Sequence, residues 1–254
     1  MTNANFIKKL ISEEKRIDGR ALDKFRDVSV EKGIIKTAEG SARVKIGDTE
    51  VIAGVKLKVM APYPDSPNEG SLMVDLELIP LANPEFESGP PREAAVEMSR
   101  VIDRGIRESK TIDTEKLCIE EGEAVWCVNI DIHTVNDAGN LLDAGALAAL
   151  AALEDAKLLK YDLEGKKIIR ESAGPLPVIH KPIAITIVKI GNQLILDPTL
   201  EEWKALDSRI TITTMENGDI CALQKGGDGF FTKEEVEKAA DMALESGKAL
   251  RERL

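Results

Sequence analysis

Cysteine, histidine and long apolar runs are all scarce in this sequence, and each scarcity excludes a class of protein. The cysteines are odd in number and unpaired in spacing: Cys118, Cys127 and Cys221. We therefore expect no disulfide framework, and we expect a reducing, cytoplasmic setting. His133 and His180 lie far apart in no metal-ligand motif, so we expect neither a metal site nor a cofactor. No stretch reaches the roughly 20 apolar residues that span a bilayer, and residues 1–20 lack the apolar core of a signal peptide.

Positive charge is also in short supply. The chain has 34 lysines and arginines against 45 acidic residues, which gives a formal net charge of −11. Such a chain is not expected to bind nucleic acid over its whole surface. A local cluster of cations is still compatible with this balance, because phosphate contacts are decided within a Debye length of about 8–10 Å. With 254 residues, 43% of them hydrophobic, the chain can bury a substantial core.

Two similar series of strands and helices account for most of the chain. The first series has strand patterns followed by two helices, at 41–47, 50–60, 71–82, 89–110 (helix), 124–137 and 139–158 (helix). The second has strand patterns at 182–198 and 208–226 and a closing helix at 232–254. The tetrapeptide VKIG ends an early strand in both series. These patterns predict an α+β fold of two related strand-and-helix units packed together, 1–160 and 183–254, with residues 161–182 as a proline- and glycine-rich connector.

Three arginines lie in single file on the helix predicted at 89–110. Arg100, Arg104 and Arg107 fall within a wedge of roughly 60° at helical spacing, opposite an apolar face. A solvated helix face, with the pairs Glu97–Arg100 and Asp103–Arg107, explains this spacing without any function. The alternative is a phosphate-binding surface, since a guanidinium group presents a planar fork to phosphate oxygens. The pattern by itself favours the solvated face.

Two other stretches contain residue types that chemistry uses. The acids of 197–207 would suit magnesium or a general acid, but such runs are more typical of an exposed turn or short helix with its carboxylates in water: Asp197, Glu201, Glu202 and Asp207. The glycine-rich residues 224–231 precede a helix but have no nucleotide-binding spacing, and Asp228 would repel an anion. We interpret them as a loop.

Several stretches taken together resemble the ribonuclease-PH-like family of phosphorolytic exoribonuclease subunits. They occur in the family's order over nearly the whole chain and include RIDGR (16–20), PPREAAVEMSRVIDRGIRES (90–109), NDAGNLLDAGALAALAAL (136–153) and ALQKGGDGFFT (222–232). The resemblance is strongest to the non-catalytic ring subunit of the archaeal exosome. It implies a fold of two repeated sheet-and-helix units, which agrees with the pattern of elements.

The resemblance also indicates which catalytic elements are missing. Catalysing members seat inorganic phosphate with a Gly-Ser/Thr-Arg element at a helix N-terminus, which would fall at residues 139–142, where no arginine or hydroxyl stands. They protonate the leaving oxygen with an aspartate, which would fall near residues 206–209, with Asp207 close to that position. The sequence therefore resembles an inactive sibling rather than an enzyme.

In the non-catalytic archaeal subunit, two arginines on this helix face the RNA channel, and Arg100 and Arg104 match them; Arg107 extends the file by position. The resemblance implies a hexameric ring of three heterodimers with a catalytic sibling, RNA-binding cap subunits, and 3′–5′ degradation of single-stranded RNA. We expect this chain to shape the sibling's active site and to bind RNA through these arginines. Two alternatives stay open: an active phosphate-dependent 3′–5′ exoribonuclease with Asp207 as general acid, and a small-molecule kinase on a related fold.

Overall fold

A large mixed sheet forms the first part of the computed structural model, which describes residues 4–254. Its strands follow the order β1-β2-β3-β6-β4, and β5 pairs with the end of β6. They are β1 (Val28–Lys32), β2 (Gly40–Ile46), β3 (Thr49–Met60), β4 (Ser71–Glu77), β5 (Cys118–Glu120) and β6 (Ala124–Asn136). All neighbours are antiparallel except β4 and β6. Alternate residues of β3 from Thr49 to Leu57 are buried, so one face of the sheet carries the core.

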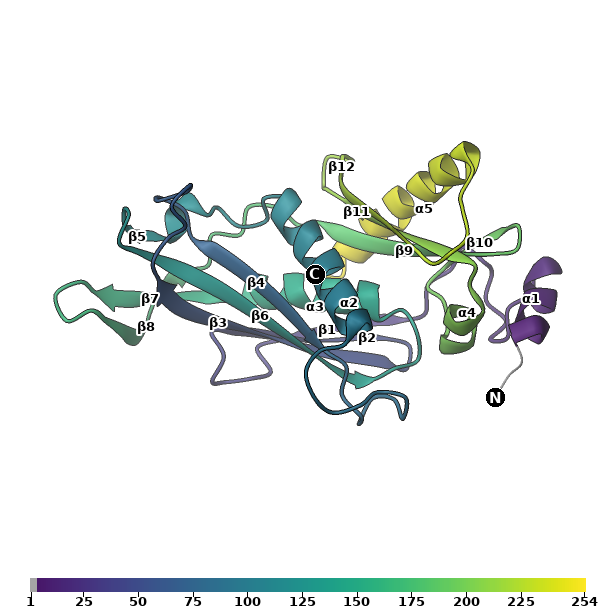
Figure 1. Cartoon of the computed structure of the whole chain (residues 1–254), viewed down its shortest axis with the longest axis horizontal. Coiled ribbons are helices and arrows are strands. Elements are labelled where there is room, and N and C mark those ends of the chain that lie inside the picture. Colours follow the sequence, from purple (N-terminus) through teal and green to yellow (C-terminus); the bar gives the residue numbers. More distant parts are fainter. Residues whose placement is uncertain (1–3) are drawn as a thin grey trace.

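A smaller antiparallel sheet forms the second part, in the order β10-β9-β11-β12. Its strands are β9 (Ile183–Ile190), β10 (Gln193–Leu196), β11 (Ser208–Thr214) and β12 (Ile220–Gly226). The closing helix α5 (Lys233–Arg251) packs on β9 and β11. A capping box begins this helix: the Thr232 side chain accepts from the Glu235 N–H, and the Glu235 carboxylate accepts from the Thr232 N–H. Helices α1 (Ala4–Ser12) and α4 (Leu200–Ala205) pack together at the end of this part (Figure 1).

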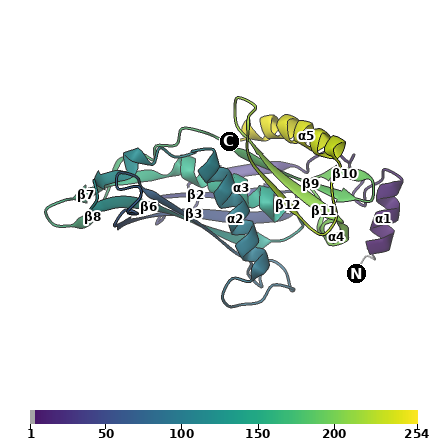
Figure 2. The same ribbon diagram turned by 45° about the horizontal axis from the view of Figure 1, so that its top comes forward.

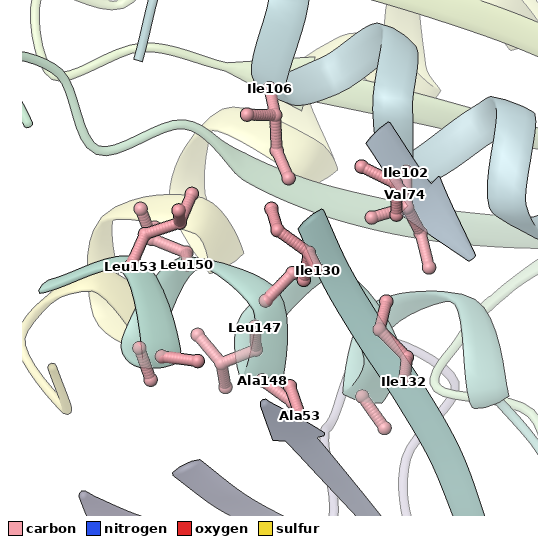
Figure 3. Packing of buried hydrophobic residues seen from close by; sticks show 14 of the residues in the cluster. Ala53, Val74, Ile102, Ile106, Ile130, Ile132, Leu147, Ala148, Leu150 and Leu153 are labelled. Carbon is pink, nitrogen blue, oxygen red and sulfur yellow. The ribbon is translucent and has the colours of Figure 1, made fainter. Parts of the chain in front are cut away.

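Two helices lie between the sheets and join their cores. Helix α3 (Leu141–Asp155) contacts β2 and β3 of the first sheet and β9 of the second, and it is buried nearly all round. Helix α2 (Glu93–Glu108) packs on β4, α3 and β12, and Figure 2 shows it in front of α3 and beside β12. Figure 3 shows Ile106 of α2 pointing toward Ile130 of β6. The predicted α+β class, with two strand-and-helix units packed together, is confirmed.

The segment 161–182 contains regular structure that the sequence pattern did not reveal. Most of the predicted connector belongs to a two-stranded hairpin, β7 (Lys157–Asp162) and β8 (Lys167–Pro175). The glycines that indicated a connector lie at the turn and at a register shift, so the strands tolerate them. Hairpin strands with little buried surface lack the apolar alternation by which a strand is recognised. The division into units 1–160 and 183–254 stays a prediction.

The acidic stretch after β10 is also different from our expectation. Asp197 and Glu202 are fully buried, where the sequence indicated carboxylates in water. Each is paired with arginines of residues 16–26, which are remote in sequence, so nothing local indicates the burial. Among residues 4–254, no helix is both long and apolar enough to cross a membrane. The same residues contain no group of three or more potential ligands that would suit a metal ion.

Candidate nucleic-acid interface

Helix α2 presents its arginine file to solvent because its other face is fixed on both sheets. The buried face consists of Ala95, Met98, Val101, Ile102, Gly105 and Ile106. Gly105 allows a close approach to the second sheet: a Cβ at this position would lie 3.1 Å from the Thr213 hydroxyl. Arg100, Arg104 and Arg107 are all exposed on the opposite face, as the spacing predicts.

The outer face of α2 and the edge strand β12 form a groove of about 600 Å³. Its charged lining residues are Glu93, Glu97, Arg100, Asp103, Arg104, Arg107 and Glu108, joined by Gln224 of β12. Carboxylates therefore outnumber guanidinium groups by four to three in the lining. A simple count of charge does not make this groove an anion site, so the pairing of each group decides what it can bind.

The three arginines differ in whether they form ion pairs with neighbouring carboxylates. Arg107 donates to both Asp103 carboxylate oxygens, at 3.0 and 2.7 Å, and to the Leu72 carbonyl at 2.9 Å. The hydrogen bonds that Arg107 donates to Asp103 raise the pKa of Arg107 and hold its guanidinium in place. Arg100 and Arg104 make no ion pair or side-chain hydrogen bond within the described part of the chain. Their guanidinium groups are the cations of the groove that are available to a ligand.

The pair Asp103–Arg107 thus forms as the solvated-face interpretation expects, but the pair Glu97–Arg100 does not. Glu97 instead forms an ion pair with Arg209 of β11, at 2.7 Å between Oε1 and Nη2. Arg209 is 6% exposed and its guanidinium lies 5.3 Å from the Trp203 ring centroid. Sequence reasoning missed Arg209, because 112 positions separate it from Glu97 and no periodicity connects them.

The predicted position of a phosphate seat, residues 139–142, is filled by acidic side chains. Asn140 precedes α3 with φ 60°, and its amide donates to Asp143 and to Asp197, each at 2.9 Å. Asp197 also accepts from Arg20 at 2.8 Å and from Arg26 at 2.7 Å. Burial by itself would raise the pKa of Asp197, but the hydrogen bonds and charge of Arg26 outweigh it and lower the pKa.

Asp143 lies beside this cluster in the first turn of α3 and is 1% exposed. Burial raises its pKa to about 7, against hydrogen bonds from Thr186 and Asn140 that lower it. Neither Asp143 Oδ1 nor Asn140 Oδ1 has a hydrogen-bond partner among the described residues. A proton on Asp143 would turn one of these two acceptors into a donor. The helix N-terminus that a phosphate would need is therefore already occupied by carboxyl groups.

Asp207, near the predicted position of a general acid, has a separate set of partners. Lys8 of α1 donates to Asp207 at 2.6 Å, and the Gly191 N–H donates at 2.7 Å. The hydrogen bond from Lys8 lowers the pKa of Asp207. An ionised carboxylate with a lowered pKa is a poor proton donor near neutral pH. The partners of Asp207 and those of residues 139–142 do not overlap, so the structure does not bring the two predicted elements into one site.

The opening RIDGR stretch has a structural role that the sequence did not indicate. Arg16 donates from Nε and Nη2 to Glu202, at 2.9 and 2.6 Å, and both side chains are 0% exposed. Its Nη groups also donate to the Leu196 and Asp197 carbonyls. Arg20 pairs with Asp197, so two arginines of the motif fasten the N-terminal segment to the second sheet.

Comparison with known families assigns the class of protein. The chain matches both domains of the 3′ exoribonuclease (RNase PH) family: domain 1 over residues 24–158 and domain 2 over residues 180–246. The two matches together cover most of the chain. The chain belongs to this family, and the resemblance seen in the sequence is confirmed.

Within the family, similar curated proteins carry one name. The exosome complex component Rrp42 of Methanothermobacter thermautotrophicus is 50% identical over 93% of this chain and 88% of its own length. The same component of Thermoplasma acidophilum is 49% identical over 98% of this chain and 94% of its own length.

Solved structures agree with the curated relatives. A chain of the Archaeoglobus fulgidus exosome with RNA bound to the active site has a TM-score of 0.92 at 42% identity, and covers 98% of this chain and 96% of its own. A chain of an archaeal exosome core has a TM-score of 0.87 at 40% identity, over 98% and 95%. Rice Rrp46, at 20% identity and a TM-score of 0.70 over 93% and 97% of the two chains, shares the fold.

Proposed function

We propose that this chain is a non-catalytic ring subunit of an archaeal-type exosome, which binds RNA beside the active site of a catalytic ribonuclease-PH-like sibling. Three heterodimers would form the hexameric ring, with RNA-binding cap subunits on one face. The proposal rests on the exosome components and exosome structures that this chain resembles over nearly its whole length. The cytoplasmic location stays a prediction.

The observation that supports RNA binding is that the guanidinium groups of Arg100 and Arg104 are exposed and unpaired in the described chain. Both arginines line the groove. Phosphate contacts of this kind hold the RNA backbone and do not select a sequence. Arg107 has a smaller part, because its fork is engaged by Asp103 and by the Leu72 carbonyl. The acidic lining also means that the sibling must supply further positive charge to enclose the RNA.

Two features support the absence of catalysis by this chain. Carboxyl groups of Asp143 and Asp197 adjoin the N-terminus of α3, and the ionised Asp197 would repel an anion placed there. The lowered pKa of Asp207 is the wrong direction for a general acid. The alternative of an active exoribonuclease with Asp207 as general acid is therefore not favoured, and the absence of a nucleotide loop disfavours the kinase.

The test is RNA binding by the assembled, catalytically disabled complex across several salt concentrations. For single-stranded RNA, log K falls with log salt at about 0.7 per phosphate neutralised, so Arg100→Ala with Arg104→Ala should flatten the slope by roughly 1–1.5. The fold should survive, because both side chains project into solvent. Different RNA sequences should lose affinity to a similar degree.

The matched control is Lys238→Ala with Lys248→Ala on α5. These two lysines are exposed and have no ion pair in the described residues. Their replacement removes two positive charges from a helix, as the arginine substitutions do. The control should leave the salt slope at the wild-type value. Equal behaviour of the arginine variant and the lysine control would show that the arginines form only a solvated helix face.

A further inference from the structure

The guanidinium of Arg100 is unpaired although the carboxylate of Glu97 lies one helical turn before it. Glu97 and Arg100 have the i, i+3 spacing at which side chains on a helix meet and form ion pairs. On the same helix, Asp103 and Arg107 use i, i+4 spacing and do pair. A contact elsewhere in the tertiary structure must therefore prevent Glu97 from pairing with Arg100.

Arg209 is the competitor for Glu97. Its side chain is 7% exposed, and Glu97 is its only carboxylate partner in the described chain. A buried guanidinium without a counter-charge is far more costly than an exposed one, which water solvates. The carboxylate of Glu97 therefore belongs to Arg209, and the exposed Arg100 is left unpaired.

The second sheet is shaped to hold Arg209 in this place. The guanidinium lies 5.3 Å from the Trp203 ring centroid and close to Gly226, the residue that pairs with Arg209 across β11 and β12. A Cβ at position 226 would lie 2.0 Å from Arg209 Nη1, so the guanidinium fits because residue 226 is glycine. Nη1 has no hydrogen-bond partner in the described residues, and Nη2 lies 2.7 Å from Oε1 of Glu97.

We propose that Arg209 is a positioning residue for RNA binding: it captures Glu97 from beneath α2 and so keeps Arg100 open to an RNA phosphate. This inference rests on the proposed function, because it assigns Arg209 to the same groove. Arg209 touches no RNA itself. Without it, Glu97 pairs with Arg100, so that the guanidinium of Arg100 is no longer available to an RNA phosphate.

The experiment measures single-stranded RNA binding by the assembled, catalytically disabled complex with three substitutions in this chain, tested singly and in combination. Arg209→Met should weaken binding about five- to tenfold at moderate salt and flatten the salt slope by about 0.7, the loss of one phosphate contact. The chain should still fold, since Glu97 is 41% exposed at its side chain and can return to water. Adding Glu97→Gln to Arg209→Met should restore most of the affinity. In an Arg100→Ala background, Arg209→Met should have almost no further effect on binding.

Gly226→Ala gives the same test without removing a charge. The added methyl group displaces the guanidinium, so this variant should reproduce the weaker binding and the flatter slope of Arg209→Met. Arg251→Met is the control, because it removes a half-buried arginine that donates to the Thr214 and Lys181 carbonyls. It should bind RNA as the wild type does.

The outcomes separate this inference from the proposed function. Wild-type binding by Arg100→Ala would overturn both. Weak binding by Arg100→Ala with unchanged binding by Arg209→Met and Gly226→Ala would overturn only the role of Arg209. Failure of Glu97→Gln to rescue Arg209→Met, or an equal loss in the Arg100→Ala background, would also overturn it, because the effect would then not pass through Glu97 and Arg100.

Discussion

Replacement of Asp143 by asparagine should change how the stability of this protein depends on pH. Burial raises the pKa of Asp143 from 3.8 to about 7 in the folded chain, while the unfolded chain keeps the ordinary value. Between these two values, the folded state retains a proton that the unfolded state has lost. Its stabilising contribution is therefore fully present below pH 4 and is lost as the pH rises toward 7. Asparagine at position 143 keeps the shape and has no proton to lose.

The magnitude follows from the shift. Three pKa units at about 1.4 kcal/mol each correspond to roughly 4 kcal/mol across the full window. The sequence pI is near 4.9, and proteins near zero net charge tend to associate, so measurements should begin at pH 5.5. From pH 5.5 to 8, the wild type should lose about 2 kcal/mol of unfolding free energy relative to Asp143→Asn. The ionised partner Asp197 contributes little to this difference, because its lowered pKa keeps it charged in both proteins.

Urea unfolding at several pH values, followed by the fluorescence of Trp126 and Trp203, measures this difference. The matched control is Asp131→Asn, which replaces an exposed aspartate on the outer face of β6. Its stability should run parallel to that of the wild type. Parallel curves for Asp143→Asn as well would refute the reasoning, because Asp143 would then be ionised in the folded state despite its burial.

Three further predictions concern activity, assembly and the buried ion pair. The purified chain should not degrade single-stranded RNA with phosphate, and adding the catalytic sibling should give activity above that of the sibling alone; phosphate-dependent release of nucleoside diphosphates that Asp207→Asn abolishes would contradict this. Co-expression with the sibling should give a heterohexamer by native mass spectrometry, with more than about 1,000 Å² buried per contact; separate monomers at micromolar concentration would count against the assignment. Glu202→Gln should cost about 3–5 kcal/mol of unfolding free energy, because it leaves the Arg16 guanidinium buried without a counter-charge; urea unfolding with a loss below about 1 kcal/mol would show that the pair is dispensable.

The sequence by itself determined the features that depend on local periodicity and on ordered motifs. The apolar positions of 89–110 place Arg100, Arg104 and Arg107 on the exposed face of α2, because helical spacing fixes which residues share a face. Thr232 and Glu235 mark the start of α5 for the same local reason. The order of the motifs along the chain was sufficient for the family.

Only the tertiary structure decided which charges are free. The sequence offers Glu97 to Arg100 and places Glu202 in water, yet both carboxylates are taken by arginines more than 100 positions away. The reason is physical: a helical pair gains a few tenths of a kcal/mol in water, whereas a buried guanidinium without a partner costs several. Burial is a property of the packed sheets. The spacing within a single element therefore does not reveal that Glu97 pairs with Arg209 and Glu202 with Arg16.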